Sequence, residues 1–262
     1  MAKIRVRARA VDMLGRQQIA GIPTAIHELF KNAHDAYANH VEVDYFRADG
    51  TFALRDDGYG MTRDEFEDRW LTLGTESKIG ANREKTPSFL DKSTQRRVIL
   101  GEKGIGRLAI ATIGRQVLIL SRAKRKDGLQ DLVVSFIHWG LFEVPGVDLD
   151  KIVIPIETLP GGSLPDTHLV RWLTDKVANN VRELSDEMSN EDATTIIQEL
   201  NSFSIDPEQA DEALNGLSLR GDGTGMHFYI MPADPILERD IDETSFDDIA
   251  STLQKMLLGF SN

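Results

Sequence analysis

The 262-residue sequence contains no cysteine, which excludes disulfide bonds and thiolate metal ligands. No apolar run approaches the length of a membrane span, and the opening residues MAKIRVRARA lack the apolar stretch of a secretory signal. The sequence also has no Gly-Lys pair, so it holds no Walker A loop. We therefore expect no membrane role, and we predict a cytoplasmic location.

The composition is that of an ordinary globular protein. Hydrophobic residues make up 41% of the chain and charged residues 27%, and the length suits one large α/β domain or a domain with an insertion. The formal net charge of −12 argues against this chain wrapping nucleic acid by itself, because the phosphates would repel it. A nucleic-acid role would need other segments.

Hydrophobic periodicity and turn residues predict the order of the elements. Residues 1–12 alternate and predict a strand or an arm, and Thr62 with Glu65 forms the signature of a capping box at the start of a helix. Further helices are predicted from about Met13 and over 26–38, 105–114 and 245–260. Hairpins are predicted for 40–46 with 50–58 and for 115–124 with 129–139, and single strands for 151–160 and 223–231. An acidic helical segment is predicted at about 167–216.

A polar stripe runs along the predicted helix IHELFKNAHDAYA. Glu28, Asn32 and Asp35 are spaced by four and three residues, which places them on one helix face, while the apolar residues form the opposite face. The stripe is compatible with a solvated surface or with a polar ligand.

The stretch RDDGYGM carries Asp56 at the end of a predicted strand, followed by Gly58 and Gly60. Glycines let the backbone turn sharply and let a ligand come close, and the carboxylate can accept a hydrogen bond from an amine such as that of adenine. A simple Asp-Gly turn is the alternative interpretation.

The stretch GEKGIGRLA places Gly101, Gly104 and Gly106 before a predicted helix. Successive backbone N–H groups at a helix N-terminus can bind phosphate, since the helix dipole also favours an anion there. A flexible hinge explains the same pattern.

In this order, the three stretches resemble the N box and the two glycine boxes of the GHKL ATPase superfamily, which includes gyrase B, the ninety-kilodalton heat-shock chaperone, histidine kinases and MutL. LGTESK at 73–78 resembles the phosphate-side loop of the MutL, MORC and chaperone branches, and GDGTGMHFYI at 221–230 resembles the late Gly-Thr box. The resemblance covers nearly the whole chain except 167–216, and it is closest to the MORC-like and chaperone-like hydrolytic branches.

The resemblance implies an α+β fold of the Bergerat type. The expected architecture is a two-layer sandwich with a mixed, mostly antiparallel sheet and helices on one face. It implies a single ATP-binding domain over 1–262, with an N-terminal arm at 1–12, an ATP lid at about 77–103 and the helical insertion at about 167–216. We also expect the chain to be the N-terminal fragment of a longer protein.

The resemblance further implies ATP and Mg²⁺ as ligands, with Glu28 as general base and Asn32 as the Mg²⁺ ligand. Asp56 resembles the adenine-reading carboxylate of the family, and Lys78 and Lys103 would supply cations for the phosphates. The implied nucleotide-binding set is Asn32, Asp35, Ala36, Asp56, Gly58, Gly60, Met61, Thr75, Ser77, Lys78, Gly101, Lys103, Gly104, Ile105, Gly106, Arg107 and Thr224.

The implied activity is Mg-dependent ATP hydrolysis that drives lid closure and N-terminal dimerisation in a clamp, with a protein or DNA client bound through domains outside this chain. A nucleotide-sensing scaffold that does not hydrolyse ATP is the alternative. Phosphotransfer of the histidine-kinase type is disfavoured, because those relatives lack the glutamate that Glu28 resembles.

Overall fold

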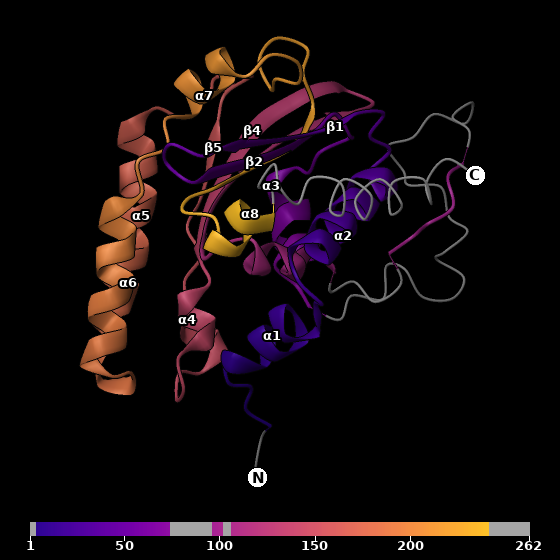
Figure 1. The fold of residues 1–262 in the computed structure, drawn as a ribbon. Coiled ribbons are helices and arrows are strands. Elements are labelled where there is room, and N and C mark those ends of the chain that lie inside the picture. Colours follow the sequence, from indigo (N-terminus) through magenta and orange to yellow (C-terminus); the bar gives the residue numbers. More distant parts are fainter. Residues whose placement is uncertain (1–3, 74–95, 102–105, 241–262) are drawn as a thin grey trace.

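The computed structural model describes residues 4–73, 96–101 and 106–240. A six-stranded sheet forms its centre, and helices pack around it (Figure 1). The elements are α1 (Arg9–Leu14), η1 (Arg16–Gln18), α2 (Ile22–Asp35), β1 (Val41–Phe46), β2 (Thr51–Asp56), α3 (Arg63–Glu65), η2 (Phe66–Trp70), η5 (Gly106–Thr112), β3 (Gln116–Arg125), β4 (Gly128–His138), α4 (Gly140–Glu143), η6 (Leu149–Lys151), β5 (Ile156–Leu159), α5 (Thr167–Glu183), η7 (Ser185–Glu187), α6 (Asn190–Ser202), α7 (Pro207–Ala213), β6 (Gly225–Ile230) and α8 (Pro235–Asp240).

The strands lie in the order β1-β2-β6-β3-β4-β5. Two hairpins, β1–β2 and β3–β4, supply four of them, and the late strand β6 enters between β2 and β3 and runs antiparallel to both. The predicted α+β class is confirmed. The sheet was expected to be mostly antiparallel, and every pairing among the described strands is antiparallel.

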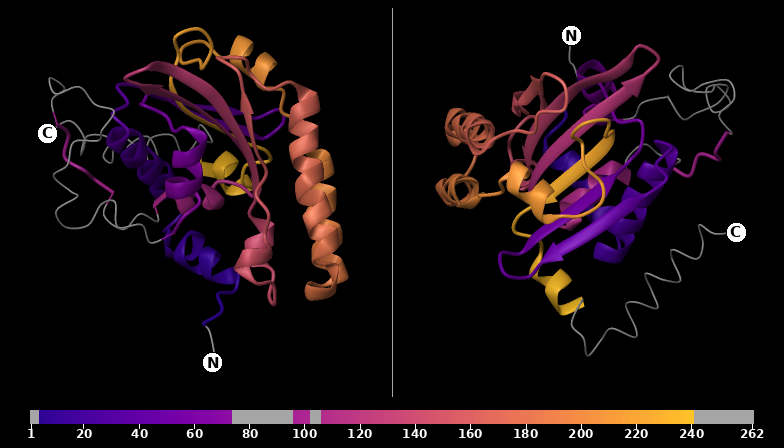
Figure 2. Two further views of the ribbon diagram at one scale, coloured as in Figure 1. Left: turned by 180° about the vertical axis from the view of Figure 1, so that it is seen from behind. Right: turned by 90° about the horizontal axis from the view of Figure 1, so that it is seen from above.

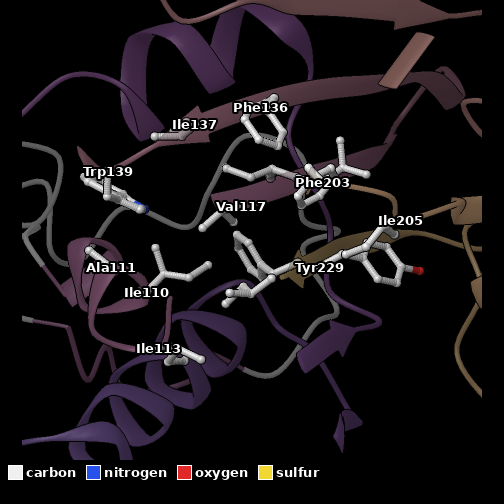
Figure 3. Packing of buried hydrophobic residues seen from close by; sticks show 14 of the residues in the cluster. Ile110, Ala111, Ile113, Val117, Phe136, Ile137, Trp139, Phe203, Ile205 and Tyr229 are labelled. Carbon is white, nitrogen blue, oxygen red and sulfur yellow. The ribbon is translucent and has the colours of Figure 1, made fainter. Parts of the chain in front are cut away.

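The predicted sandwich of sheet and helices is confirmed, and helices α5 and α6 of the predicted helical insertion cover the second face of the sheet. Successive strand residues point to opposite faces, so Ile137 and Phe136 mark the two sides of β4. Ile137 lies with Val11 of α1 and Leu108 of η5. The ring of Phe136 packs edge-on against Phe203 at the end of α6, with centroids 4.8 Å apart (Figure 3).

The helices α5 and α6 lie side by side against this second face (Figure 2). Their apolar residues, including Val170, Leu173, Val177 and Leu200, belong to the same buried cluster as the strands. The physical reason is visible in β4, which is apolar at neighbouring positions and therefore must be covered on both sides.

Several local predictions are confirmed. Both hairpins form, and the helix after the glycine loop begins with the capping box, in which Thr62 N–H donates to Glu65 Oε2 at 3.0 Å. The helix predicted from Met13 begins earlier, at Arg9, where the Ala8 N–H donates to the Val147 carbonyl and holds the preceding segment against the domain.

Two other elements are shorter or tighter than predicted. The strand expected over 151–160 is confined to β5, because Pro155 lacks the N–H that a sheet ladder requires. The helix predicted over 105–114 is a 3₁₀ helix in its described part.

The predicted helix 245–260 and residues 77–95 of the predicted lid lie outside the described residues. No helix in the described part of the chain is long and apolar enough to cross a membrane.

The packing of Phe203 generates a stability prediction. Phe203 is 7% exposed, so Phe203→Ala should lower the free energy of unfolding by about 3 kcal/mol, since it removes a buried ring and leaves a cavity. Phe46→Ala, at a ring that is 38% exposed, should cost much less. Urea unfolding of both variants measures the difference, and equal losses would contradict the assigned packing of α6.

Candidate nucleotide-binding site

Helix α2 carries the polar stripe on the sheet side that also holds η5. Pro23 stands in its first turn, and the buried residues Ile26 and Leu29 fix its apolar face. Glu28 reaches the glycine-rich segment, because a Cβ added at Gly106 would lie 2.7 Å from Glu28 Oε2. The fold therefore brings the first and third motifs close together, and a side chain at residue 106 would displace the Glu28 carboxylate from this position.

Glu28 has a partner that the sequence analysis missed. Lys31 Nζ lies 2.5 Å from Glu28 Oε1, one helical turn further along. A Lys three residues after a Glu on a helix is a recognised ion-pair spacing, so the signal was present in the sequence. The pair leaves Glu28 Oε2 as the carboxylate oxygen nearer to Gly106.

Asn32 lies one turn beyond Glu28 and is half-buried. Its side-chain amide forms no hydrogen bond with the described residues, so its oxygen is available to a ligand. The described residues contain no group of three or more His, Cys, Asp or Glu side chains that could hold a metal ion. Such a group is not needed for Mg²⁺ bound between one amide oxygen, water and phosphates.

Asp35 holds the backbone that leads into the glycine-rich segment. Its Oδ1 accepts from the Leu100 N–H at 2.8 Å, and its Oδ2 accepts from the Gly101 N–H at 3.0 Å. Both carboxylate oxygens are thus used within the protein. The contacts favour a role for Asp35 in positioning the segment around Gly101 over the direct nucleotide contact that the resemblance implies.

Asp56 ends strand β2 and is only 4% exposed. Its Oδ1 accepts from the Gly58 N–H at 2.9 Å and from the Met226 N–H at 3.2 Å, while no described residue donates to Oδ2. Burial raises the pKa of Asp56 to about 7, and the two amide donors oppose that shift. The carboxyl group therefore presents one oxygen for a ligand from a buried, fixed position.

The loop after Asp56 can follow its path only with glycines. A Cβ at Gly60, whose φ is +55°, would lie 2.1 Å from the Arg122 carbonyl oxygen, and one at Gly58 would lie 2.9 Å from the Ala36 carbonyl oxygen. The Ala36 carbonyl also accepts from the Tyr59 N–H, which ties the end of α2 to this loop.

The loop is anchored at its far end by strand β3. The Met61 N–H donates to Ser121 Oγ at 2.8 Å. Arg125 donates to the carbonyls of Tyr59 and Gly60 and also pairs with Glu65. The sequence analysis missed Ser121 and Arg125, and no local pattern marks them, because their contacts join residues about sixty positions apart.

Thr224 directly precedes β6 beside Asp56. Its neighbour Gly225 has a φ of +127°, and a Cβ there would lie 1.8 Å from the Asp56 carbonyl oxygen. Gly225 is therefore required for β6 to meet β2 at this point, and it brings the Met226 N–H to Asp56. Thr224 was predicted as a site residue and Gly225 was not. A glycine at the start of a predicted strand is the signal that could have marked it.

The remaining predicted residues divide into two groups. Arg107 is half-buried, burial lowers its pKa to about 10, and its guanidinium donates to the Thr72 carbonyl. It is thus cationic at neutral pH and contacts the chain that leads toward 73–78. The other members, Thr75, Ser77, Lys78, Lys103, Gly104 and Ile105, lie outside the described residues.

A buried clamp lies directly behind Asp56, on the opposite face of the sheet. The Arg55 guanidinium donates to the carbonyls of Asn215 and Leu217 and pairs with Glu42 and Asp44. It joins the end of the helical segment to strands β1 and β2. The segment after α7 is thereby fixed to the strand that carries Asp56.

These features define a class of site: a buried carboxyl group, a glycine loop, a second glycine-rich segment and a glutamate paired with lysine around one side of an antiparallel sheet. Residues 21–148 match the family model described as histidine kinase-, DNA gyrase B-, and HSP90-like ATPase. The match covers just under half of the chain, and it agrees with the resemblance of the motifs to the GHKL ATPase superfamily. It supports ATP binding at the general level of that family. No curated protein sequence matches the chain.

The raised pKa of Asp56 generates a pH prediction. The pKa of Asp56 is about 7 in the folded state, against an ordinary value of 3.8. Between these two pH values the unfolded state has already released the proton that the folded state keeps, so the free energy of unfolding falls as the pH rises. Asp56→Asn keeps the Oδ1 acceptor and removes the titration. Its stability relative to the wild type should therefore increase between pH 4 and pH 7 and reach a gain of about 4 kcal/mol above pH 7.

Denaturant unfolding of both proteins across that pH range measures the effect. Asp57→Asn is a suitable control, because the pKa of Asp57 is lowered and its carboxylate bonds to His40 near the surface. A stability difference between Asp56→Asn and the wild type that does not vary with pH would contradict the prediction.

Proposed function

We propose that this domain binds Mg·ATP and hydrolyses it to ADP and phosphate, in the manner of the MORC-like and chaperone-like branches that its motifs resemble. The observation that carries the proposal is the contact between Glu28 Oε2 and the position of Gly106. It joins a candidate general base to the segment that would cover the phosphates.

In this proposal the adenine lies at the end of β2. Asp56 Oδ2 accepts a hydrogen bond from the exocyclic amine, while Oδ1 keeps its two backbone donors. Gly58 and Gly60 allow close approach, Met61 lines the base, and Thr224 completes the polar surroundings. Burial of Asp56 favours this role, because a fixed acceptor in a dry site discriminates well between bases.

The phosphates would lie between α2 and the segment from Gly101 to Arg107. Asn32 would hold Mg²⁺, which supplies charge neutralisation on the phosphate oxygens when bound. Glu28 orients a water molecule and takes its proton as the water oxygen bonds to the γ-phosphorus. The bond from that phosphorus to the bridging oxygen breaks, and ADP leaves with the bonding electrons.

A non-hydrolytic nucleotide sensor is the second candidate, and one observation favours it. The ion pair with Lys31 engages Glu28 Oε1 at 2.5 Å, so the glutamate already has a structural partner. In that case nucleotide would only set the conformation of the domain. Turnover by a glutamate variant distinguishes the two candidates.

Glu28→Ala should retain Mg·ATP affinity and lose turnover by about a hundredfold or more, the usual contribution of a positioned base. Phosphate release and calorimetric nucleotide binding measure the two properties separately. Glu67→Ala, at an exposed glutamate of η2, should leave both unchanged. Asp56→Asn supplies the opposite control, because it should lose nucleotide affinity. Equal turnover by Glu28→Ala and the wild type would remove Glu28 from catalysis.

ATP-dependent homodimerisation through the N-terminal region completes the proposal. Exposed apolar side chains gather in that part of the sequence, namely Ile4, Val6, Met13 and Leu14. Single exposed apolar residues are common, but several within one short segment favour a contact surface. The proposed location is the cytoplasm, which agrees with the absence of cysteine.

Light scattering tests the dimer. The mass should double with Mg²⁺ and a non-hydrolysable ATP analogue, and it should remain monomeric when Met13 and Leu14 are both changed to Ser. The matched control changes Val43 and Ile236, two exposed apolar residues on other elements, to Ser. A nucleotide-bound wild type that stays monomeric would refute dimerisation by this chain.

A further inference from the structure

A cavity of about 640 Å³ lies against the sheet away from the candidate nucleotide site. Its floor includes Ile137 and Trp139 at the end of β4, which Figure 3 shows next to one another. One wall comes from Val11 of α1 and Trp70 of η2, and the other from the connection that carries Ile154. Neither Asp56 nor any residue of the polar stripe on α2 lines it.

The described residues that line the cavity are apolar apart from one charged pair. Arg63 and Glu67, one helical turn apart, form an ion pair of 3.0 Å in which each side chain is about half exposed. The other lining residues are aliphatic or aromatic. A molecule bound here would therefore need an apolar body, and its polar end could exchange hydrogen bonds with the Arg63 or Glu67 side chain.

The shape favours a small molecule over a protein segment. The volume lies within the range of about 300 to 1,000 Å³ that is usual for small-molecule pockets. The walls belong to separate elements that surround a concave space, and a flat or ridged partner surface would contact only its rim. Trp70 and Trp139 both line the cavity, and each is otherwise buried, with exposed fractions of 5% and 4%.

We propose that this cavity binds a small amphiphile, consisting of an aliphatic or aromatic body with one acidic end, at a site separate from the nucleotide site. The acidic end pairs with Arg63 at the rim, since a guanidinium binds a carboxylate through two parallel hydrogen bonds. The body lies along the floor against the two tryptophans. This binding does not depend on the nucleotide site and would persist if the proposed ATP hydrolysis were disproved.

Tryptophan fluorescence gives a direct test. The chain has three tryptophans, and the third, Trp172, is exposed on α5. A Trp172→Phe background therefore leaves only the two that line the cavity. A bromine-terminated medium-chain fatty acid, used below its micelle concentration, should quench this emission in a saturable way. The same fatty acid without bromine should compete and restore the emission.

Matched variants locate the binding. Ile154→Phe fills part of the cavity and should raise the half-saturating concentration by about tenfold or more. Val153→Phe places the same ring at the preceding residue, which is 53% exposed and does not line the cavity, and should leave binding unchanged. Ile152→Phe is a second filled variant if Ile154→Phe does not fold. Quenching that never saturates, or equal binding by the filled variants and Val153→Phe, would overturn the proposal.

Discussion

The buried carboxylate of Asp56 is the constraint on which the candidate site depends. Taking this group out of water raises its pKa, and the strand ends are arranged around it to supply two backbone donors. One donor comes from the adjacent glycine loop and the other from Met226, about 170 residues later. The carboxylate therefore fixes the loop, the start of β6 and the open Oδ2 in one arrangement.

The second face of the sheet supports that arrangement from behind. Arg55 lies in the same strand, directly before Asp56, and its guanidinium donates to the carbonyls of Asn215 and Leu217. A buried guanidinium with two carboxylates and two carbonyls is costly to disturb, because each partner would lose its compensation. The segment from α5 to α7 is thus part of the folded core. Its acidic side chains lie on the solvated outer surface and do not determine where it packs.

Local chemistry was sufficient to predict part of this structure. The turn residues gave both hairpins, Thr62 and Glu65 gave the capping box, and the spacing of Glu28 and Asn32 gave their shared face. Contacts between distant residues were not predictable in the same way. The position of β6 depends on Gly225 meeting Asp56, and a single sequence does not contain that pairing. Coverage of the second face did have a signal, since β4 carries apolar residues at neighbouring positions on both sides of Ser135, which is typical of a strand buried on both faces.

The ion pair on α2 bears on whether this domain can be a hydrolase. A general base must be ionised and must also have an oxygen directed at the water it activates. Lys31 contacts Oε1, and Oε2 is the oxygen next to Gly106. The two requirements therefore fall on different oxygens of the same carboxylate. Lys31 engages one oxygen while the other remains directed at the glycine-rich segment, so an engaged Glu28 is compatible with catalysis.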